Sequence, residues 1–363
     1  MAGLNLFDQV HKLNKGAIGY MHQYEELVVK VVDLKGSYYQ MGLQQSEEIR
    51  SSSKLEQQAL LQSMTKTSNA QKAQQIFQDV SPNLLHELEG LATGLQMPLD
   101  TVVKMYSGYN ISFPTMGCTA FVQSGNYVRN YDFSPKIYDA RLVFSKPTHG
   151  YASVGFSQQI IGRLDGMNEK GLVVGLHFVN NDYKDEGFIA STIVRILLDQ
   201  CKNIEEAIAL IAKLPHGYGY NYSMTDQSGK AIVVEASPQE QFIRADNPLI
   251  CTNHFESTVL QDNNRKWIEG SVQRKEYVTS FLKEELSANA AYRHFNDGQS
   301  PVFFKDYQAY FGTLHTVVYS PGNLEILVGI GENSEPNLLS LKEYIEGSLA
   351  FPGTIMGKIY QEI

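Results

Sequence analysis

The spacing of apolar residues divides the chain into a mainly helical first part and a second part rich in short strands. A β-branched run at residues 27–32 precedes a polar, Gln-rich segment, from about 36 to 79, with apolar residues at helical spacing. These apolar residues are Leu55, Leu60, Leu61 and Met64. Ser81 and Pro82 are typical of an N-cap and a first helical position, so they predict another helix. That helix carries Leu84, Leu85, Leu88 and Leu91 on one face.

After Phe113-Pro114, short runs of β-branched and aromatic residues alternate with Gly and Asn turns. The runs at 118–123 and 127–133, joined by Ser124-Gly125-Asn126, predict a tight hairpin. Further strands are predicted at 142–144, 171–178, 231–235, 241–245, 249–252, 315–319 and 325–330. Helices are predicted at 189–201, at 204–214 with Asn203 as N-cap, and at 267–286. This order of elements, without an obvious linker or repeat, predicts one compact α+β layered sandwich.

Composition and charge limit the binding partners and the cellular compartment that we expect for the protein. The 363 residues are 43% hydrophobic, enough for a large core, and they carry a net charge of −9, from 30 Lys and Arg against 39 Asp and Glu. This balance argues against nucleic acid as the main partner. No apolar stretch approaches the roughly 20 residues of a membrane span, and the N-terminus lacks the pattern of a secretory signal. We therefore expect no membrane span and a cytoplasmic location, while the oligomeric state stays unknown.

Cofactor and metal patterns are missing from the sequence. There is no GxGxxG, P-loop, HExxH or EF-hand pattern, so we expect no cofactor and no metal. The three cysteines, Cys118, Cys201 and Cys251, exclude a disulfide scaffold and provide no CxxC pair for zinc. Cys201 and Cys251 are interpreted as core residues, which is the usual fate of a free cysteine.

The segment from 113 to 135 carries the most chemical information. Cys118 begins the first strand of the predicted hairpin, and Arg129 and Asp132 lie on the returning strand. Strict alternation places Arg129 and Asp132 on opposite faces. The returning strand brings polar groups near the thiol, and a neighbouring cation favours the nucleophilic thiolate. From spacing alone, a buried structural cysteine is favoured over a nucleophile, and a structural ion pair would satisfy Arg129 and Asp132 just as well.

Four segments in order resemble the cysteine N-terminal-nucleophile (Ntn) hydrolases. This group contains the choloylglycine hydrolases, the penicillin V acylases and the isopenicillin-N acyltransferases. Gly117-Cys118-Thr119 with Arg129-Asn130-Tyr131-Asp132-Phe133 is similar to the start of such enzymes, and residues 165–172, 247–255 and 271–274 follow in the family order. The resemblance implies a four-layer αββα sandwich of two antiparallel sheets. It also implies a propeptide-like part, 1–117, and a catalytic part, 118–363, folded together as one domain.

The resemblance implies that Cys118 is the nucleophile and is released by autocatalytic cleavage after Gly117. The free α-amino group of Cys118 would then act as the base, because its pKa of about 7.7–8.0 lies near working pH. Gly117 suits such a cleavage, since a residue without a Cβ tolerates a strained geometry. Asp132 matches the aspartate that orients the new amino group.

The resemblance also assigns the remaining site residues. Arg129 matches an arginine that favours the thiolate, Asn253 an asparagine of the oxyanion hole, and Arg274 an arginine that completes the site. His177 stands where the bile salt hydrolases have an oxyanion-hole asparagine, and either its backbone N–H or its imidazole could replace that donor. Asn168 is interpreted as a structural turn residue.

Three functions are compatible with these residues to different degrees. The leading hypothesis is a self-processing hydrolase or acyltransferase that acts on a small or lipid-like linear amide through a Cys118 thioester. The alternative is an unprocessed, catalytically silent binding protein on the same scaffold. A papain-like protease ranks well behind, because neither Gly-Ser before Cys118 nor Trp after it is present. The sequence leaves open the acyl group, the amine and the acceptor.

Overall fold

Two antiparallel-rich sheets, packed face to face, form the centre of the molecule. The computed structural model describes residues 22–51, 63–112, 114–307 and 311–362. Within these residues, the larger sheet has nine strands and the smaller has seven. The large sheet runs in the order β10 (Gln241–Arg244), β9 (Ala231–Ala236), β8 (Tyr220–Thr225), β7 (Val173–Phe178), β6 (Gly162–Asn168), β5 (Ser153–Gln158), β4 (Arg141–Pro147), β1 (His22–Gly36), β16 (Thr354–Glu362). The small sheet runs in the order β11 (Leu249–Cys251), β2 (Gly117–Gln123), β3 (Asn126–Phe133), β13 (Phe311–Ser320), β14 (Glu325–Ile330), β15 (Asn337–Ser340), with β12 (Lys305–Asp306) paired to β13.

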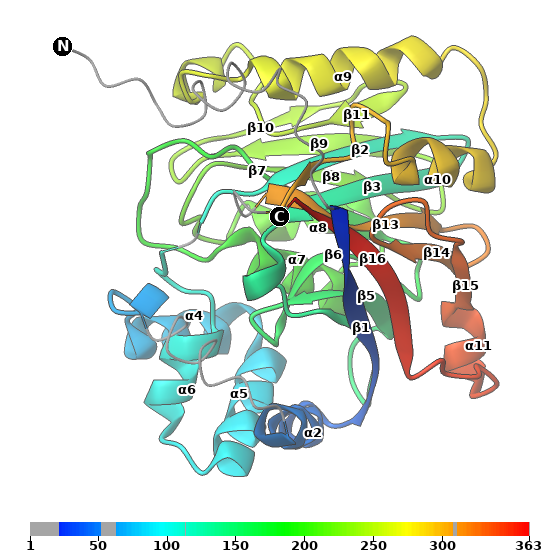
Figure 1. The fold of residues 1–363 in the computed structure, drawn as a ribbon. Coiled ribbons are helices and arrows are strands. Elements are labelled where there is room, and N and C mark those ends of the chain that lie inside the picture. The colour runs from blue at the N-terminus through cyan, green and yellow to red at the C-terminus, as the bar shows by residue number, and fades with distance from the viewer. Residues whose placement is uncertain (1–21, 52–62, 113, 308–310, 363) are drawn as a thin grey trace.

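Helices cover the outer face of each sheet (Figure 1). The helix α7 (Ala190–Gln200) packs on β6 and β7 of the large sheet, with α8 (Ile204–Ile211) beside it. On the small sheet, α9 (Glu269–Phe281) packs against β11 and β2, and α10 (Ala288–Asn296) packs against β3, β13 and β14. Helix, sheet, sheet and helix therefore form four layers, which confirms the predicted α+β sandwich. None of the described helices is long and apolar enough to cross a membrane.

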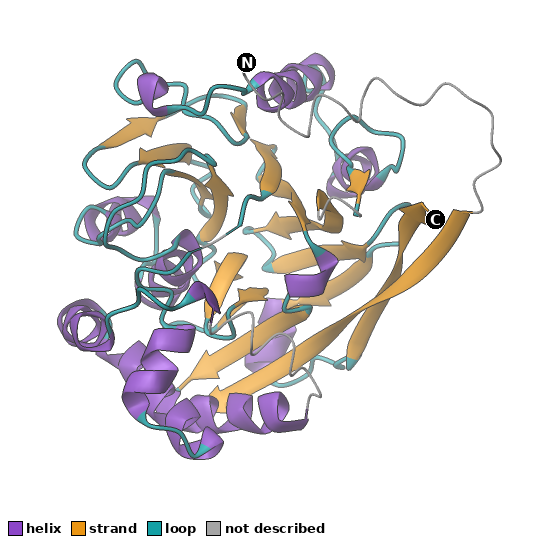
Figure 2. Cartoon of the chain, turned by 60° about the vertical axis from the view of Figure 1, so that its left-hand side comes forward, coloured by secondary structure: helices purple, strands orange, loops and turns teal. Residues whose placement is uncertain are grey.

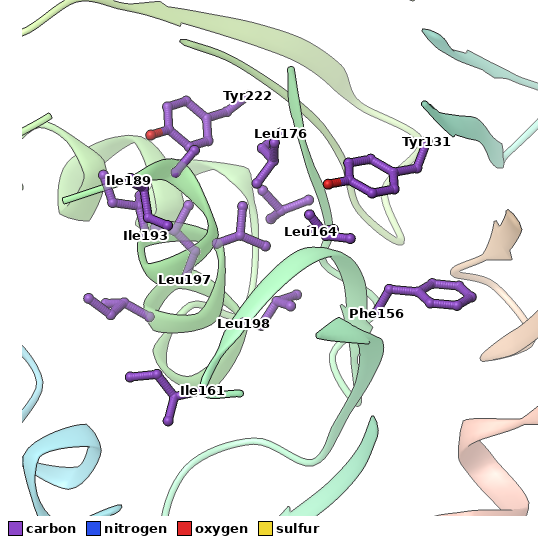
Figure 3. Close-up of a cluster of buried hydrophobic side chains, with 14 of the residues drawn as sticks. Tyr131, Phe156, Ile161, Leu164, Leu176, Ile189, Ile193, Leu197, Leu198 and Tyr222 are labelled. Atoms are coloured by element: carbon purple, nitrogen blue, oxygen red, sulfur yellow. The ribbon is translucent and has the colours of Figure 1, made fainter. Parts of the chain in front are cut away.

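The strands of the large sheet near α7 are buried on both faces. Figure 3 shows Leu164 of β6 and Leu176 of β7 close to Ile193 and Leu197 of α7. The neighbouring residues in sequence, Asp165 and His177, point instead toward the small sheet, because side chains alternate along a strand. The inter-sheet layer therefore contains polar groups that are fully enclosed by protein.

Residues before 117 contribute both a strand and a helical cluster. The strand β1 is much longer than the predicted run at 27–32, and it lies between β16 and β4, parallel to β4. The helices are α2 (Tyr38–Ser51), α4 (Ala70–Val80), α5 (Pro82–Leu95) and α6 (Leu99–Tyr106), and they gather at one end of the sandwich (Figure 2). Helices α2 and α5 cross so closely that the contact needs a glycine on each, Gly42 on α2 and Gly90 on α5. A Cβ on either would overlap a backbone carbonyl of the other helix.

Several sequence predictions are confirmed. The hairpin forms with Ser124 and Gly125 at positive φ, and Cys118 pairs with Tyr131. Asn203 caps α8 by accepting from the Glu206 N–H at 3.0 Å, and Cys201 ends α7. Ser81 precedes α5 as predicted, but its side chain makes no capping hydrogen bond.

Other predictions were wrong in extent or missed an element. The predicted helix at 267–286 is shorter, and the elements β5, β6, β8, α6, α10, α11 (Leu341–Glu346), β15 and β16 were not predicted. The strands β5, β6 and β8 are rich in Gly, Ser, Asn or charged residues and carry a weak β signal in the sequence. Each of them is stabilised as a strand by pairing with a neighbour on both sides. Leu55, Leu60 and Leu61 lie outside the described residues.

A buried ionic cluster joins α5 to α7. Arg195 of α7 is fully buried, and its Nη2 donates to Glu87 Oε2 of α5 at 2.6 Å. Its Nε donates to both carboxylate oxygens of Asp199 at 2.9 Å. Gln45 of α2 donates to Glu87 Oε1 at 2.5 Å, so residues from both sides of position 117 share one network. Such a network is costly to break, because any partner left behind is a buried, uncompensated charge.

Replacement of Arg195 by Met tests this cluster. We expect a loss of about 3–5 kcal/mol in the free energy of unfolding, because Glu87 and Asp199 stay buried without their cation. Urea denaturation followed by circular dichroism measures the loss. The matched control is Arg293→Met, whose pair with Glu335 is exposed; its effect should stay within about 0.5 kcal/mol. Equal effects of the two changes would contradict the interpretation.

Candidate active site

The β2–β3 hairpin divides the candidate residues between two faces of the small sheet. Cys118 pairs with Tyr131 and Ala120 pairs with Arg129, so Cys118 and Arg129 share the face toward the large sheet. Gly117 pairs with Asp132, and both lie on the opposite face, under α9 and α10. The regular register therefore keeps Arg129 and Asp132 on opposite faces, as strand alternation predicts.

The thiol of Cys118 is fully buried and contacts a guanidinium. Arg129 Nη2 donates to Cys118 Sγ at 3.0 Å and to the Leu176 carbonyl at 2.7 Å. Burial raises the pKa of the Cys118 thiol to about 12, and the Arg129 charge opposes that rise. In the uncut chain, burial therefore keeps the Cys118 thiol protonated. The Arg129 guanidinium, which favours the thiolate, is already in contact with the sulfur.

Arg129 is itself fixed from the large sheet. Its Nη1 pairs with Asp165 Oδ2 of β6, and both side chains are fully buried. The Tyr319 hydroxyl donates to Asp165 Oδ1 at 2.6 Å, and His315 Nε2 lies 3.4 Å from Oδ2. Burial alone would raise the pKa of Asp165, but Arg129, His315 and Tyr319 together outweigh burial and the pKa is lowered. Asp165 therefore remains ionised and anchors the arginine.

The backbone of Cys118 is held at both its amide and its carbonyl. Asn253, in the turn after β11, accepts from the Cys118 N–H through Oδ1 at 2.8 Å. Arg274 of α9 donates to the Cys118 carbonyl at 2.9 Å and to Asn253 Oδ1 at 2.9 Å. Asn253 Nδ2 donates in turn to the Phe178 carbonyl at 2.9 Å, so both ends of its amide have the matching partner.

Asp132 lies beside Gly117 with one oxygen unused. The Thr313 hydroxyl donates to Asp132 Oδ1 at 2.6 Å, whereas the buried Oδ2 makes no hydrogen bond within the described residues and lies 3.7 Å from Arg274 Nη1. A Cβ placed on Gly117 would lie 2.9 Å from this Oδ2 and would overlap the Phe311 ring. Burial raises the pKa of Asp132 to about 6, against the opposing effect of Arg274.

His177 of β7 completes the group. It is fully buried, its Nε2 lies 2.8 Å from Ser223 Oγ, and its imidazole faces the backbone of Cys118. Burial, followed by the charge of Arg129, lowers its pKa well below the usual range. The structure thus gathers all the residues that the sequence singled out: Gly117, Cys118, Arg129, Asp132, His177, Asn253 and Arg274.

The sequence missed the residues that support this group. Asp165 lies in the segment 165–172 of the family resemblance, and its place there is the sequence signal that points to it. Thr313, Tyr319 and Ser223 carry no such signal, because their contacts depend on pairing with strands distant in sequence.

Residues interpreted as structural are confirmed in that role. Asn168 donates to the carbonyls of Leu198 and Cys201 at 2.9 and 2.8 Å, which ties β6 to the end of α7. Cys201 and Cys251 are buried in the main core. Across the described ranges, no group of three or more His, Cys, Asp or Glu side chains is arranged to hold a metal ion.

Comparisons with known proteins place the chain in a family. Residues 122–335 match the model of the acyl-coenzyme A:6-aminopenicillanic acid acyl-transferase family. None of the curated proteins matches the chain by sequence.

Solved structures with a similar fold include three enzymes of low sequence identity. The conjugated bile acid hydrolase of Clostridium perfringens is 15% identical, with 63% of this chain and 93% of that chain covered and a TM-score of 0.42. The penicillin V acylase of Agrobacterium tumefaciens is 14% identical, with 62% and 86% covered and a TM-score of 0.38. The Caenorhabditis elegans ortholog of N-acylethanolamine-hydrolyzing acid amidase is 10% identical, with 57% and 93% covered and a TM-score of 0.39.

The family model spans more than half of the 363 residues, from within β2 to the loop after β14. The chain therefore belongs to the acyl-coenzyme A:6-aminopenicillanic acid acyl-transferase family.

Proposed function

We propose that this protein is a self-processing cysteine hydrolase or acyltransferase that acts on a linear amide or acyl donor through a thioester at Cys118. The observation that carries the proposal is the convergence on one residue: Arg129 contacts the Cys118 thiol, while Asn253 and Arg274 hold its amide and carbonyl. A merely structural buried cysteine has no need of charged partners around its backbone and its sulfur.

The proposed maturation begins with attack of Cys118 Sγ on the carbonyl carbon of Gly117. The C–N bond to Cys118 breaks, the nitrogen takes up a proton, and a thioester joins Gly117 to the sulfur. Water then hydrolyses the thioester, which leaves the Gly117 carboxylate and a free α-amino group on Cys118. Gly117 supports this step, because the absence of a Cβ lets the peptide lie against Asp132 and Phe311.

The surroundings of Cys118 suit the new amino group. An ammonium group has three N–H donors, whereas the amide in the continuous chain has only one. Asn253 Oδ1 already accepts from this nitrogen, and the unused Asp132 Oδ2 near Gly117 is an available second acceptor. With a pKa of about 7.7–8.0 as a reference, the amine can accept the thiol proton and later protonate the leaving amine.

In turnover, Cys118 Sγ attacks the substrate carbonyl, the amine leaves, and water or a second amine releases the acyl group from the thioester. Asn253 and a second donor stabilise the oxyanion. The substrate is a small or lipid-like linear amide. The parts 1–117 and 118–363 would stay together after cleavage, a proposal that β1 in the large sheet and the pairing of Glu87 with Arg195 support.

Intact-mass analysis tests maturation directly. We expect wild-type protein to contain a chain that begins at Cys118 and ends at Ile363, and we expect Cys118→Ala to remain uncut. The matched controls are Cys201→Ala and Cys251→Ala, which remove the other buried thiols and should be cut like wild type. A panel of penicillin V, glycine-conjugated bile acids, N-acyl homoserine lactones, and acyl-coenzyme A with an amine then measures turnover, which Cys118→Ala should abolish.

Two results would contradict this mechanism. One is an uncut wild-type chain with full amidase activity. The other is activity in a Cys118→Ala protein whose circular dichroism shows a native fold. An uncut, inactive chain whose Cys118 resists iodoacetamide would instead support the silent binding protein.

Asp132 should lower the free energy of unfolding as the pH rises, because burial raises the pKa of its carboxyl in the folded state. Its folded pKa of about 6 lies above the unfolded value of 3.8, so the stability it contributes is complete below about pH 4 and is lost as the pH rises through 6. In the uncut Cys118→Ala background, Asp132→Asn should therefore equal its parent near pH 4. It should be more stable by up to about 3 kcal/mol above pH 6. Urea unfolding from pH 4 to 8 measures this difference.

The control for Asp132 is the exposed Asp182→Asn in the same background, for which no pH-dependent difference is expected. A stability difference for Asp132→Asn that stays constant with pH, or that grows as the pH falls, would show that burial does not hold its carboxyl in the neutral form.

A further inference from the structure

His177 has a buried nitrogen without a partner next to the nucleophile. Its Nε2 lies 2.8 Å from Ser223 Oγ, but its Nδ1 is buried and makes no hydrogen bond within the described part of the chain. Buried polar atoms are nearly always paired, so an unpaired one in an active site indicates a group that is kept for a ligand or an intermediate. Which role Nδ1 can fill depends on whether it carries the proton.

Tyr127 and Ser223 decide the position of that proton. The Tyr127 hydroxyl lies 2.7 Å from Ser223 Oγ, and burial raises the pKa of Tyr127, so the hydroxyl keeps its hydrogen. Either oxygen could donate in this pair, but among the described residues Ser223 Oγ is the partner of the Tyr127 hydroxyl, so we assign Ser223 Oγ as its acceptor. This leaves the single Ser223 hydrogen free to be donated elsewhere. Nε2 of His177 accepts it at 2.8 Å, whereas the other acceptor, the Gly175 carbonyl, lies at 3.4 Å. A neutral imidazole that accepts at Nε2 carries its hydrogen on Nδ1.

The backbone is shaped to allow this chain of hydrogen bonds. Gly175 pairs directly with Ser223 across β7 and β8, and a Cβ on Gly175 would overlap the Tyr127 hydroxyl. Tyr127 comes from β3 of the small sheet, so the contact crosses between the two sheets at a position that only glycine permits.

The backbone that faces the imidazole offers it an acceptor and no free donor. The imidazole lies against the backbone of Cys118, whose amide hydrogen is already taken by Asn253 Oδ1. The remaining polar group of that backbone is the carbonyl oxygen, an acceptor that already takes a hydrogen bond from Arg274 at 2.9 Å. The charged groups around His177 are Arg129 of β3 and Arg274 of α9, which disfavour a second proton, and Asp165 of β6, which favours one. Burial and Arg129 prevail and lower the pKa of His177, so the ring stays neutral.

We propose that His177 is the neutral Nδ1–H tautomer and that this N–H is a catalytic hydrogen-bond donor to the oxyanion formed when Cys118 attacks a carbonyl. When the new S–C bond forms, the carbonyl π electrons move to oxygen, and a fixed neutral donor stabilises that charge without giving up a proton. Ser223 and Tyr127 are positioning residues, because they act on the reaction only through the tautomer of His177. The catalytic part of this inference rests on the proposed function.

The tautomer can be measured without turnover. In uncut Cys118→Ala protein with ¹⁵N-labelled histidine, the His177 resonances are those lost in a His177→Gln variant. We expect a protonated Nδ1, an unprotonated Nε2 and no titration between pH 5 and 9. Ser223→Ala should shift the ring toward the Nε2–H tautomer. If His177 in the Cys118→Ala protein carries its hydrogen on Nε2, or becomes cationic above pH 5, the assignment is overturned. This holds whether or not the protein is an amidase.

Kinetics test the catalytic role separately. His177→Leu should lower kcat about 100-fold with little change in KM, since one oxyanion donor is removed. His177→Asn, which keeps a side-chain N–H, should recover a large part of that loss, and Ser223→Ala should show a smaller fall in kcat. The matched control is Tyr222→Phe, which removes a buried hydroxyl from the neighbouring position of β8 and should leave kcat unchanged. If the tautomer is as expected but His177→Leu keeps full kcat, the donor role is wrong while the proposed function stands.

Discussion

The ion pair between Arg129 and Asp165 is the constraint on which the site depends. Both side chains are fully enclosed, and they come from different sheets, so the pair fixes how the small sheet lies on the large one at this point. The cost of burying two charges is offset only when the remaining donors and acceptors are also satisfied. Leu176 and Cys118 take the other guanidinium contacts, and Tyr319 and His315 take the remaining positions on the carboxylate. The thiol is thus one partner of a network in which, among the described residues, the buried Arg129 Nε is left without a hydrogen bond.

This arrangement explains why so many aromatic residues surround the site. His315 stacks on Phe156 with ring centroids 3.6 Å apart, and the Tyr138 hydroxyl bonds its Nδ1 at 2.8 Å. Arg129 also lies over the Tyr131 ring, 5.3 Å from its centroid. Flat, rigid side chains exclude water from the ionic groups and leave them few alternative rotamers. The same exclusion of water raises the pKa of Cys118, so rigidity and suppressed reactivity have one physical cause in the continuous chain.

The sequence predicted most of what depends on local pattern. The Cys118 hairpin, the alternation that separates Arg129 from Asp132, and the helices on either side of Asn203 follow from residues close together in the chain. The strand β6 could not be recognised, because Gly162, Arg163, Asp165 and Asn168 interrupt any apolar run and become buried only through tertiary pairing. For the same reason the anchor Asp165 was missed although Cys118 and Arg129 were identified. The resemblance to a family pointed to the residues that the structure gathers around Cys118, but not to the ones that hold them.

The position of β1 bears on how such a chain could be divided without falling apart. Hydrogen bonds link β1 to β16 on one side and to β4 on the other, so a strand from before residue 117 closes the large sheet between two strands from after it. Removing that strand would expose two rows of backbone donors and acceptors, one on β4 and one on the edge strand β16. The cluster of Glu87, Arg195 and Asp199 adds a second junction in which a lost partner leaves a buried charge. A cut between Gly117 and Cys118 removes neither junction, because that bond lies at the first residue pair of β2 and both junctions lie elsewhere. The proposed cleavage at this bond would therefore change the charge and the hydrogen-bonding capacity of one nitrogen, and would leave in place the packing that positions Arg129, Asn253 and Arg274 around it.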